Sequence, residues 1–550
     1  MAFPRDVSRV FEQALGEDPN RPAITARSGT VTYEELDALA NQCARTLREH
    51  GVKPGDRVAA SLPNDIDILS AFHGAMRLGA IWVGINQPLA ASEKEYILRD
   101  SGTSLFLCDD ATAREMQARR EGLPGVRSIV LGSDDTADEW RSALAAQAAD
   151  PVHAIIDPHA PAAIAYTSGT TGYPKGVVHS QHNLLAPGAH LVATRQYDED
   201  LRKGDCFPLT IINVVALTTL LTAQARGSGV IMDSLRAGDV ADWIRRERVT
   251  VWNGPPPVLY TMAHDERIRS SHLQSLREVW SGGADCPETI RTAFESKFGV
   301  EIRGTYGLTE APTVVAIEVP RTPHVAGSSG IPLPHLEVTI RDADGRTLLP
   351  GEVGEICVCA RDSEEIGQRL VADWGGGTGR ELPPYRPMLS YWKKPDESDA
   401  ALRGGVLHTG DVGALDAAGN LIVSDRLNLV LNRGGANVYP AEVERVVLQF
   451  SPVDSCAALG LPDERLGQRI GLLVQFKPGH DHDIDALLAH CRGELAHYKV
   501  PEFVASVDSL PRNVMGKIDR RALTEVGQRV LTGARRMPAG VTPASGGEHP

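Results

Sequence analysis

Short apolar, strand-like runs alternate with amphipathic helical segments along residues 31–108. Residues 32–51 have helical periodicity, with Thr32 as a candidate N-cap and Gly51 after the end. A strand-like run at 56–62, a helical segment at 67–80 and a second strand-like run at 81–86 follow. The alternation returns at 205–305 without a fixed-period repeat. Strands alternating with helices predict an α/β fold with βαβ sheets.

The chain is longer than one hydrophobic core usually organises, because it has 550 residues, so we expect two or more domains. The pattern of predicted elements changes near Asp425, where a compact stretch of strand-like and helical segments begins. We predict a large N-terminal domain of several subdomains over residues 1–425 and a small α+β C-terminal domain over 426–530. Residues 531–550 end in Pro, Gly and Ser and are predicted to be a disordered tail.

Charge and composition exclude several classes of protein. The formal net charge of −15 argues against a nucleic-acid partner, since such proteins usually carry a basic patch. The N-terminus lacks the features of a secretory signal, and no apolar run reaches the ~18 residues that span a bilayer. The eight cysteines are scattered, which predicts reduced thiols in a cytoplasmic protein. A metal or redox role for Cys357 and Cys359 stays open, although no CxxC or Cys/His motif accompanies them.

The stretch YTSGTTGYPKG, Tyr166 to Gly176, lies between two strand-like runs. Its glycines let backbone N–H groups turn toward an anion, its hydroxyls add donors, and Lys175 adds a positive charge. The spacing does not match a Walker A loop, which opens a helix. The loop therefore predicts phosphate binding. The alternative is a plain flexible Ser/Thr/Gly loop, and motifs elsewhere in the chain must distinguish the two.

Four further motifs follow in order: TYGLTE at 305–310, LHTGD at 407–411, SDRLNLVLNRGGANVYPAEVE at 424–444 and LPRNVMGKIDRRAL at 510–523. Together with the loop, they resemble the adenylate-forming superfamily of acyl-CoA synthetases, peptide-synthetase adenylation domains and luciferases, from about residue 8 to residue 525. The resemblance implies that a carboxylate attacks the α-phosphorus of ATP, so that an acyl-adenylate forms and pyrophosphate leaves. It further implies ATP, Mg²⁺ and CoA as cofactor and co-substrates.

The resemblance also assigns a set of ATP-binding residues. They are Thr167, Ser168, Gly169, Thr170, Thr171, Gly172, Lys175, Gly283, Ala284, Asp285, Thr305, Tyr306, Gly307, Thr309, Asp411, Arg426 and Lys517. The loop from 167 to 175 would wrap the β- and γ-phosphates, and residues 283–285 would line the adenine pocket. Asp411 would accept hydrogen bonds from both ribose hydroxyls, and Arg426 would contact the ribose or a phosphate at the domain junction.

Three residues are expected to be catalytic, namely Thr309, Glu310 and Lys517. Tyr306 would stack on the adenine, and Thr309 would hydrogen-bond the α-phosphate. Glu310 would hold Mg²⁺, with Thr170 as a second metal-site residue; a solvated surface carboxylate is the alternative for Glu310. Lys517 would bridge the attacking carboxylate and the α-phosphate, and a plain surface lysine in a basic stretch is the alternative.

The family runs two half-reactions in two orientations of a mobile C-terminal domain. By resemblance the hinge is Asn428, where many members have Asp or Lys. Arg433, Gly434 and Gly435 would line the pantetheine tunnel in the thioester-forming state, because glycines allow a close approach.

Two departures from the family pattern stand out. Thr210 and Ile211 occupy the places of an aromatic–His pair in the expected acyl-pocket segment 207–221, and no Asp lies between Phe207 and Ala225 to hold a substrate amino group. The apolar segment predicts a hydrophobic acid. The stretch Asp362 to Arg386 is an insertion, interpreted as a surface loop, with a lid or an oligomer contact as the alternative.

The sequence therefore predicts an ATP-dependent acid–CoA ligase. The alternatives are a stand-alone enzyme that loads a carrier protein, a luciferase-like oxygenase and a non-catalytic nucleotide-binding protein on the same fold. The identity of the acid and the oligomeric state stay open, with a homodimer as one form.

Overall fold

The computed structural model describes residues 3–132, 138–152, 154–167, 173–282, 286, 288–320, 322–342, 344–375, 382–426, 431–438, 440–477, 479, 481–511, 523, 526–527 and 529–531. The chain divides into two compact units. The first consists of Met1–Thr167 with Pro174–Asn428, and the second mainly of Leu429–Pro550. Both mix helices with sheets, which confirms the predicted α/β class.

A seven-stranded sheet of the first unit carries the loop region. Its order is β18 (Ser390–Tyr391), β8 (Lys175–Ser180), β7 (Pro161–Thr167), β4 (Ile81–Gly84), β3 (Arg57–Ser61), β5 (Leu105–Asp109) and β6 (Arg127–Leu131). The strands from β7 to β6 run parallel, whereas β8 and β18 run antiparallel to their neighbours. The strands predicted at 56–62 and 81–86 are therefore confirmed as β3 and β4.

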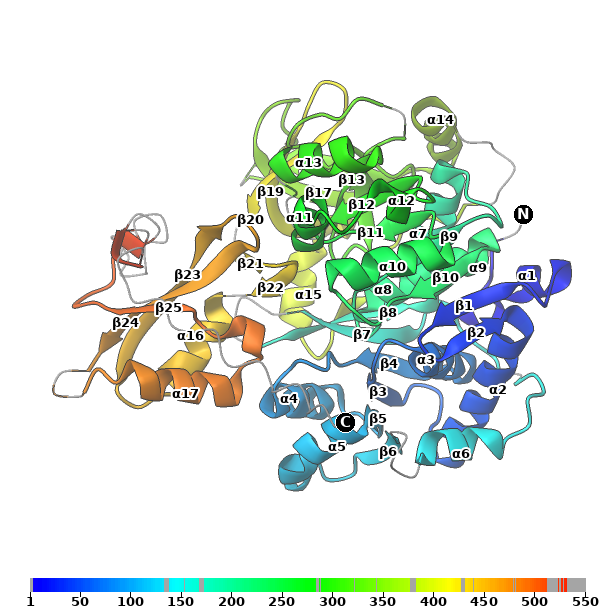
Figure 1. Cartoon of the computed structure of the whole chain (residues 1–550), viewed down its shortest axis with the longest axis horizontal. Helices are drawn as coiled ribbons and strands as arrows, with labels where there is room; N and C mark the ends of the chain where they lie inside the picture. Colours follow the sequence, from blue (N-terminus) through cyan, green and yellow to red (C-terminus); the bar gives the residue numbers. More distant parts are fainter. Residues whose placement is uncertain are drawn as a thin grey trace. The chain divides into compact units, whose positions relative to one another are not determined.

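A nine-stranded sheet forms the second layer of this unit (Figure 1). Its order is β15 (Ile331–Pro332), β14 (Val314–Ile317), β13 (Ile302–Gly307), β12 (Glu278–Gly282), β11 (Val251–Asn253), β9 (Arg202–Asp205), β10 (Ser228–Ile231), β1 (Pro22–Ala26) and β2 (Gly29–Thr32). The strands from β13 to β1 are parallel, and most of their residues are buried.

Helices cover both sheets of the first unit. The described α-helices are α1 (Glu12–Glu17), α2 (Tyr33–Glu49), α3 (Ile66–Leu78), α4 (Ala91–Ser101), α5 (Asp110–Met116), α6 (Glu139–Ala145), α7 (Gln181–Arg195), α8 (Ile212–Val215), α9 (Leu221–Ala225), α10 (Ala237–Glu247), α11 (Pro256–His264), α12 (Ser270–Leu273), α13 (Glu288–Phe298), α14 (Ser363–Trp374) and α15 (Pro395–Ala401). On the nine-stranded sheet, α10, α11 and α13 pack against one face (Figure 1). Trp252 lies in the core beneath these helices. The neighbouring Val251 faces α7 and α9 on the other side.

The start of α2 follows the sequence prediction. The Thr32 hydroxyl accepts a hydrogen bond from the Glu35 N–H (3.2 Å), and the Glu35 carboxylate accepts one from the Thr32 N–H (2.8 Å). This capping box satisfies two backbone donors at the first turn. The periodic segment at 67–80 forms α3, which ends at Gly79 in the left-handed region (φ 69°).

The insertion is a packed helix rather than the surface loop expected from its Gly and charge content. Ile366, Leu370 and Trp374 of α14 are buried, and the Arg195 guanidinium of α7 lies 5.7 Å from the Trp374 ring centroid. The predicted surface loop is therefore wrong for Ser363–Trp374. Apolar residues at helical spacing outweighed the loop-like composition of the surrounding stretch.

An antiparallel four-stranded sheet completes the first unit. Its order is β16 (Leu336–Arg341), β17 (Gly354–Ala360), β19 (Leu407–Leu415) and β20 (Leu421–Arg426). The pairing of β17 with β19 is irregular between Glu355 and Cys357. Over this interval the pairing advances by two residues on β17 and by four residues on β19. The extra residues of β19 form a bulge at Thr409–Asp411.

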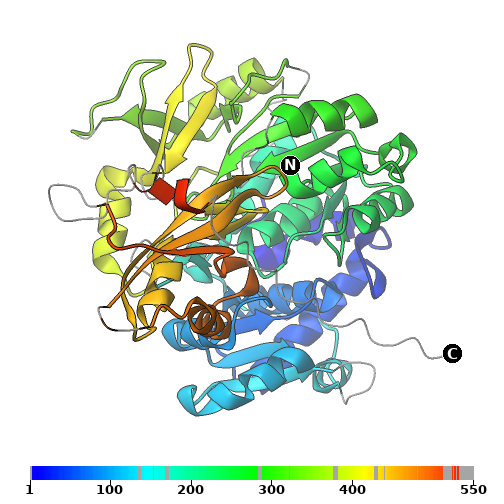
Figure 2. The same cartoon turned by 60° about the vertical axis from the view of Figure 1, so that its left-hand side comes forward.

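The second unit is a sheet in the order β22 (Ala436–Val438), β21 (Leu431–Arg433), β24 (Gly467–Phe476) and β23 (Val453–Asp463), with β25 (Phe503–Ser506) parallel to β24. The helices α16 (Pro440–Leu448) and α17 (Ile484–Glu494) pack on one face (Figure 2). Leu510, Leu523 and Leu531 pack on the other. The predicted tail beyond residue 531 lies outside the described residues.

All eight cysteines are among the described residues and are free thiols, as predicted. In the described part of the chain, no helix combines the length and apolar character needed to cross a membrane.

Candidate active site

The Ser/Thr/Gly loop connects two antiparallel strands, as the flanking sequences predicted. Thr167 at the end of β7 pairs with Lys175 at the start of β8, so the chain reverses between them. The predicted phosphate-binding residues Ser168–Gly172 lie outside the described residues. Gly176 allows a close approach here, because a Cβ on it would lie 2.6 Å from Ile164 Cγ2 and 3.1 Å from Trp392 Cβ.

Lys175 and Glu310 meet on either side of one tyrosine. The Lys175 Nζ atom lies 5.1 Å from the Tyr391 ring centroid, and the Tyr391 hydroxyl donates a hydrogen bond to Glu310 Oε1 (2.9 Å). Backbone bonds fix this segment as well, since Met388 N–H donates to the Glu310 carbonyl (2.8 Å) and Trp392 N–H to the Gly176 carbonyl (2.6 Å). The structure thus brings two predicted residues together through Tyr391, which sequence reasoning missed.

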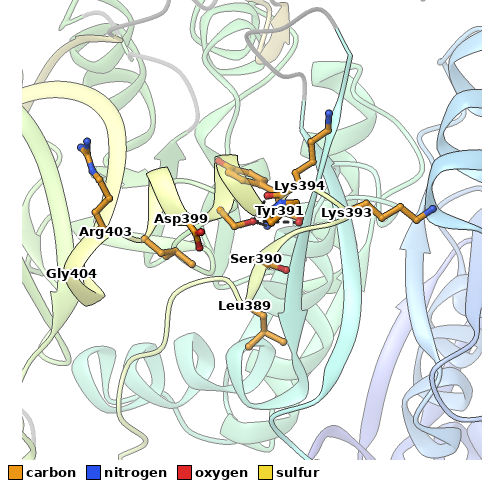
Figure 3. A pocket seen from close by; sticks show the side chains of 11 residues that line it. Leu389, Ser390, Tyr391, Lys393, Lys394, Asp399, Arg403 and Gly404 are labelled. Atoms are coloured by element: carbon orange, nitrogen blue, oxygen red, sulfur yellow. Dashed lines mark hydrogen bonds between the residues drawn. The ribbon is translucent and has the colours of Figure 1, made fainter.

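Tyr391 also lines an open hollow of about 640 Å³ between residues 389–395 and 398–404 (Figure 3). Lys393 extends away from the hollow, and its Nζ atom donates to the Asp100 carbonyl (2.6 Å) (Figure 3). The Lys394 ammonium is 3.7 Å from the Glu397 carboxylate. These lysines therefore do not converge on a shared point in the hollow.

A buried histidine holds the backbone of Thr309. His179 Nε2 donates to the Thr309 carbonyl (2.7 Å), and Asn183 Nδ2 lies 3.4 Å from His179 Nδ1. Burial lowers the pKa of His179 to about 4, outweighing the bond to the carbonyl. The imidazole is therefore neutral at physiological pH, with its proton on Nε2. His179 is the last residue of the strand-like run GVVH. Beyond this position in a strand, nothing in the sequence indicated its role.

Tyr306 and Asp411 lie together although 105 positions separate them. The Tyr306 hydroxyl donates to Asp411 Oδ2 (2.6 Å), and both side chains are buried. Asp411 sits in the β19 bulge, where Gly410 adopts φ 71°. The Thr409 hydroxyl accepts from Asp411 N–H (3.1 Å) and donates to the Ile356 carbonyl (2.7 Å). The bulge therefore aims Asp411 at the hydroxyl of Tyr306.

Thr305 and Gly307 lie at the end of β13, beside the end of β12. Thr305 pairs with Gly282, and a Cβ on Gly282 would lie 1.9 Å from the Thr305 hydroxyl oxygen. A Cβ on Gly307 would lie 1.9 Å from the Thr313 carbonyl oxygen. Carboxyl ends of parallel strands share one sheet edge, where α/β proteins bind ligands. Gly283, Ala284 and Asp285, which continue from β12, lie outside the described residues.

The predicted tunnel residues lie in the second unit. Arg433 makes two bonds to the Glu502 carboxylate (2.9 and 3.2 Å), which Arg469 also contacts (3.0 Å). Gly434 and Gly435 turn the chain with φ values of 63° and 86°. Asn428 and Lys517 lie outside the described residues, as does the side chain of Arg426.

Two family models match the chain. The model described as AMP-binding enzyme covers residues 11–361, and the model described as AMP-binding enzyme C-terminal domain covers residues 442–517. Together they span more than half of the chain.

The chain is also similar to curated proteins along nearly its whole length. It is 33% identical to long-chain-fatty-acid–CoA ligase FadD13 of Mycobacterium tuberculosis, covering 95% of this chain and 98% of the relative. It is 31% identical to feruloyl-CoA synthase of an Amycolatopsis species (91% and 94%). It is 30% identical to fatty acid–[acyl-carrier-protein] ligase ScoC of Streptomyces coeruleorubidus (92% and 94%). Among solved structures, a double mutant of o-succinylbenzoate CoA synthetase (MenE) from Bacillus subtilis matches with a TM-score of 0.80, 26% identity and coverage of 94% and 98%.

Proposed function

Since the chain belongs to the AMP-binding enzymes of the adenylate-forming superfamily, we propose that it joins a hydrophobic carboxylic acid to free CoA. It is an AMP-forming acid–thiol ligase of the acyl-CoA synthetase branch. In such a reaction the acid and ATP form an acyl-adenylate and pyrophosphate, and the CoA thiol then displaces AMP. The proposal rests above all on Lys175, Tyr391 and Glu310, which come from distant segments and lie in contact.

The roles of the individual residues are part of the proposal. The loop from Thr167 to Lys175 holds the β- and γ-phosphates through backbone N–H groups, hydroxyls and one ammonium group. His179 holds the Thr309 backbone, which leaves the Thr309 hydroxyl to donate to the α-phosphate. Asp411 receives the ribose hydroxyls from its place in the bulge, and Tyr306 provides an aromatic face for the adenine.

The donor atoms near Glu310 fit Mg²⁺. This ion takes oxygen ligands and binds in nucleotide sites through one or two carboxylates plus phosphate oxygens. The Glu310 carboxylate is such a donor, and Tyr391 fixes its orientation through one oxygen. Thr170 is the second proposed metal-site residue. When bound, Mg²⁺ would supply positive charge that offsets the negative charge of the phosphates.

The two half-reactions use two orientations of the proposed C-terminal domain. Residues 1–425 hold ATP and the acid, and the domain 426–530 brings Lys517 to the α-phosphate and then turns about Asn428. The turn at Gly434 and Gly435 passes close to the pantetheine arm. Arg433 contributes to the shape of this turn, because its guanidinium is already paired with Glu502.

The proposed acyl wall favours an acid whose acyl chain is uncharged and hydrophobic. It runs from α8 through the π-helical turn Ala216–Leu220 to α9, and its Val215 and Leu220 are fully buried. The nearest acidic group to this wall by sequence, Asp205, is paired with Lys203 (2.8 Å) and accepts from the Thr218 hydroxyl (2.6 Å). Asp205 is thus already engaged and is a poor partner for a substrate amino group, which argues against an amino-acid substrate.

A panel of carboxylic acids tests the proposal. Purified protein with Mg²⁺, ATP and each acid would be followed for pyrophosphate and AMP, with and without CoA. We expect AMP turnover that requires CoA, with long aliphatic or aromatic acids and not with amino acids. Pyrophosphate release that a phosphopantetheinyl carrier protein accelerates and CoA does not would contradict the proposal in favour of carrier loading, the activity named for ScoC.

A Tyr391→Phe variant tests the contact between Tyr391 and Glu310. Phenylalanine keeps the ring beside Lys175 and removes only the hydroxyl that donates to Glu310. A hydrogen bond to a charged group contributes about 1.5–3 kcal/mol, so we expect adenylation kcat/KM for MgATP to fall by roughly 10- to 100-fold. The Mg²⁺ concentration needed for half-maximal rate should rise. Tyr391→Leu, which also removes the ring, should lose more; a wild-type rate and Mg²⁺ dependence in Tyr391→Phe would exclude a role for the hydroxyl.

A further inference from the structure

Three side chains with metal-binding atoms converge on the four-stranded sheet, outside the set assigned to ATP. Glu355 and Cys357 lie on β17, and His408 lies opposite Cys357 on β19. One donor atom from each residue lies within 4.8 Å of the donor atoms of the other two. Among the described residues, no other group of three His, Cys, Asp or Glu side chains is arranged in this way. Cys357 and His408 are 51 positions apart, which is why the sequence shows no Cys/His motif.

The distances between these donors suit a small tetrahedral ion. His408 Nδ1 is 2.8 Å from Glu355 Oε2 and 3.5 Å from Cys357 Sγ, and Cys357 Sγ is 4.0 Å from Glu355 Oε2. Zinc bonds of about 2.0–2.3 Å in a tetrahedron set N, O and S donors roughly 3.3–3.5 Å apart. Shifts of about half an ångström would therefore complete three corners and leave the fourth for water.

A cationic side chain already faces this cluster. Arg403 Nη2 lies 3.1 Å from His408 Nδ1, and Arg403 is solvent-exposed. Cys357 is fully buried, whereas the side chains of His408 and Glu355 are 12% and 20% exposed to solvent. An ion can thus enter from the solvent side if the Arg403 side chain swings away. The arginine and the ion would then compete for the same nitrogen.

The cluster is joined to the bulge that carries Asp411. Glu355 Oε1 accepts a hydrogen bond from Gly410 N–H (3.2 Å), while Glu355 Oε2 faces His408. His408 lies three residues before Asp411 in the same strand. An ion that binds Glu355 and His408 would therefore shift two groups that hold the turn at 408–411, namely the carboxylate bonded to Gly410 N–H and the side chain of His408.

We propose that Glu355, Cys357 and His408 form a site for an exchangeable divalent ion of the zinc class, in competition with Arg403. The Cys357 thiol releases its proton to solvent as the metal–sulfur bond forms. Because its ligands flank Asp411, occupation of the site lowers affinity for the nucleoside; this last step rests on the proposed function of Asp411.

Titration with Co²⁺ tests the site without any measurement of activity. A Co²⁺–thiolate bond gives a near-ultraviolet charge-transfer band, and we expect this band in the wild-type protein. Cys357→Ser should lose it. Cys359→Ser is the matched control, because Cys359 is on the same strand but contacts Glu337, and it should keep the band. Added Zn²⁺ should displace the Co²⁺ and abolish the absorption.

Arg403→Ala provides a test that does not disturb the core. Removing the competing cation should allow the same band to develop at a roughly tenfold lower Co²⁺ concentration. The site is refuted if the wild type and Arg403→Ala show no band, or if folded Cys357→Ser keeps it.

Equilibrium binding of adenosine, which has no phosphates to chelate metal, tests the link to Asp411. Co²⁺ should weaken adenosine binding in the wild type and leave Cys357→Ser unaffected. If Co²⁺ gives the charge-transfer band but leaves the adenosine affinity unchanged, the proposed coupling to Asp411 would be refuted, whereas the metal site itself would stand. Adenosine that fails to bind without metal would instead count against the proposed function.

Discussion

A Lys517→Ala variant is expected to form acyl-adenylate roughly 10²–10³-fold more slowly than the wild type, a loss of about 3–4 kcal/mol of transition-state stabilisation. The ammonium group is proposed to neutralise charge on the attacking carboxylate and the α-phosphate, and alanine cannot replace it. Binding of MgATP should be largely kept, because the phosphate loop and Glu310 are untouched. Single-turnover pyrophosphate release at saturating acid and MgATP measures the effect.

The second half-reaction serves as an internal control for this variant. Pre-formed acyl-adenylate and CoA should still react at close to the wild-type rate, since Lys517 is assigned to the first step only. Lys477→Ala, another lysine of the second unit, is exposed and should change neither step. Adenylation at the wild-type rate by Lys517→Ala would show that the assignment is wrong.

A Glu310→Gln variant is expected to lose roughly 10²–10³-fold in adenylation kcat/KM for MgATP. Glutamine keeps an oxygen that can accept from the Tyr391 hydroxyl, so the local packing is retained. It removes the negative charge that Mg²⁺ needs. The rate should therefore recover partly at high Mg²⁺, and a titration of rate against Mg²⁺ should show a higher half-saturation point.

Glu337→Gln is a useful comparison for Glu310→Gln. Glu337 is exposed and contacts Cys359 rather than the segment around Tyr391, so its replacement should leave the Mg²⁺ titration in place. An unchanged thermal unfolding midpoint in Glu310→Gln would exclude a folding defect. A wild-type Mg²⁺ dependence in that variant would remove Glu310 from the proposed metal site.

The fold class and the strand–loop–strand arrangement were predictable because each rests on local pattern. Apolar runs bounded by turns identified β3 and β4, and the loop was flanked by the two runs that form β7 and β8. The capping box at Thr32 is equally local, since its partners are three residues apart. The pairing of Tyr306 with Asp411 was not predictable in detail, because it depends on a bulge in β19 that orients Asp411 toward a strand of another sheet.

His179 and Tyr391 were missed for a related reason. Each acts by hydrogen-bonding a predicted residue across the fold, and neither lies in a motif whose composition suggests phosphate chemistry. The helix α14 was mistaken for a loop because its Gly-rich flanks masked the spacing of Ile366, Leu370 and Trp374. The roles assigned to Lys517, Asn428 and the loop residues Ser168–Gly172 stay predictions.

The segment from Pro383 to Trp392, which begins in the last part of the insertion, is anchored at both ends, and this has a thermodynamic consequence. His182, His190 and Asn183 of α7 hold the carbonyls of Pro384, Pro383 and Pro387 at 3.0, 2.8 and 2.7 Å. Further along, Met388 and Trp392 are bonded to the Glu310 and Gly176 carbonyls. The entropy cost of ordering Tyr391 beside Glu310 is therefore incurred when the protein folds, and nucleotide binding does not have to supply it. Amide hydrogen exchange at Met388 and Trp392 should accordingly be slow even before any ligand is added.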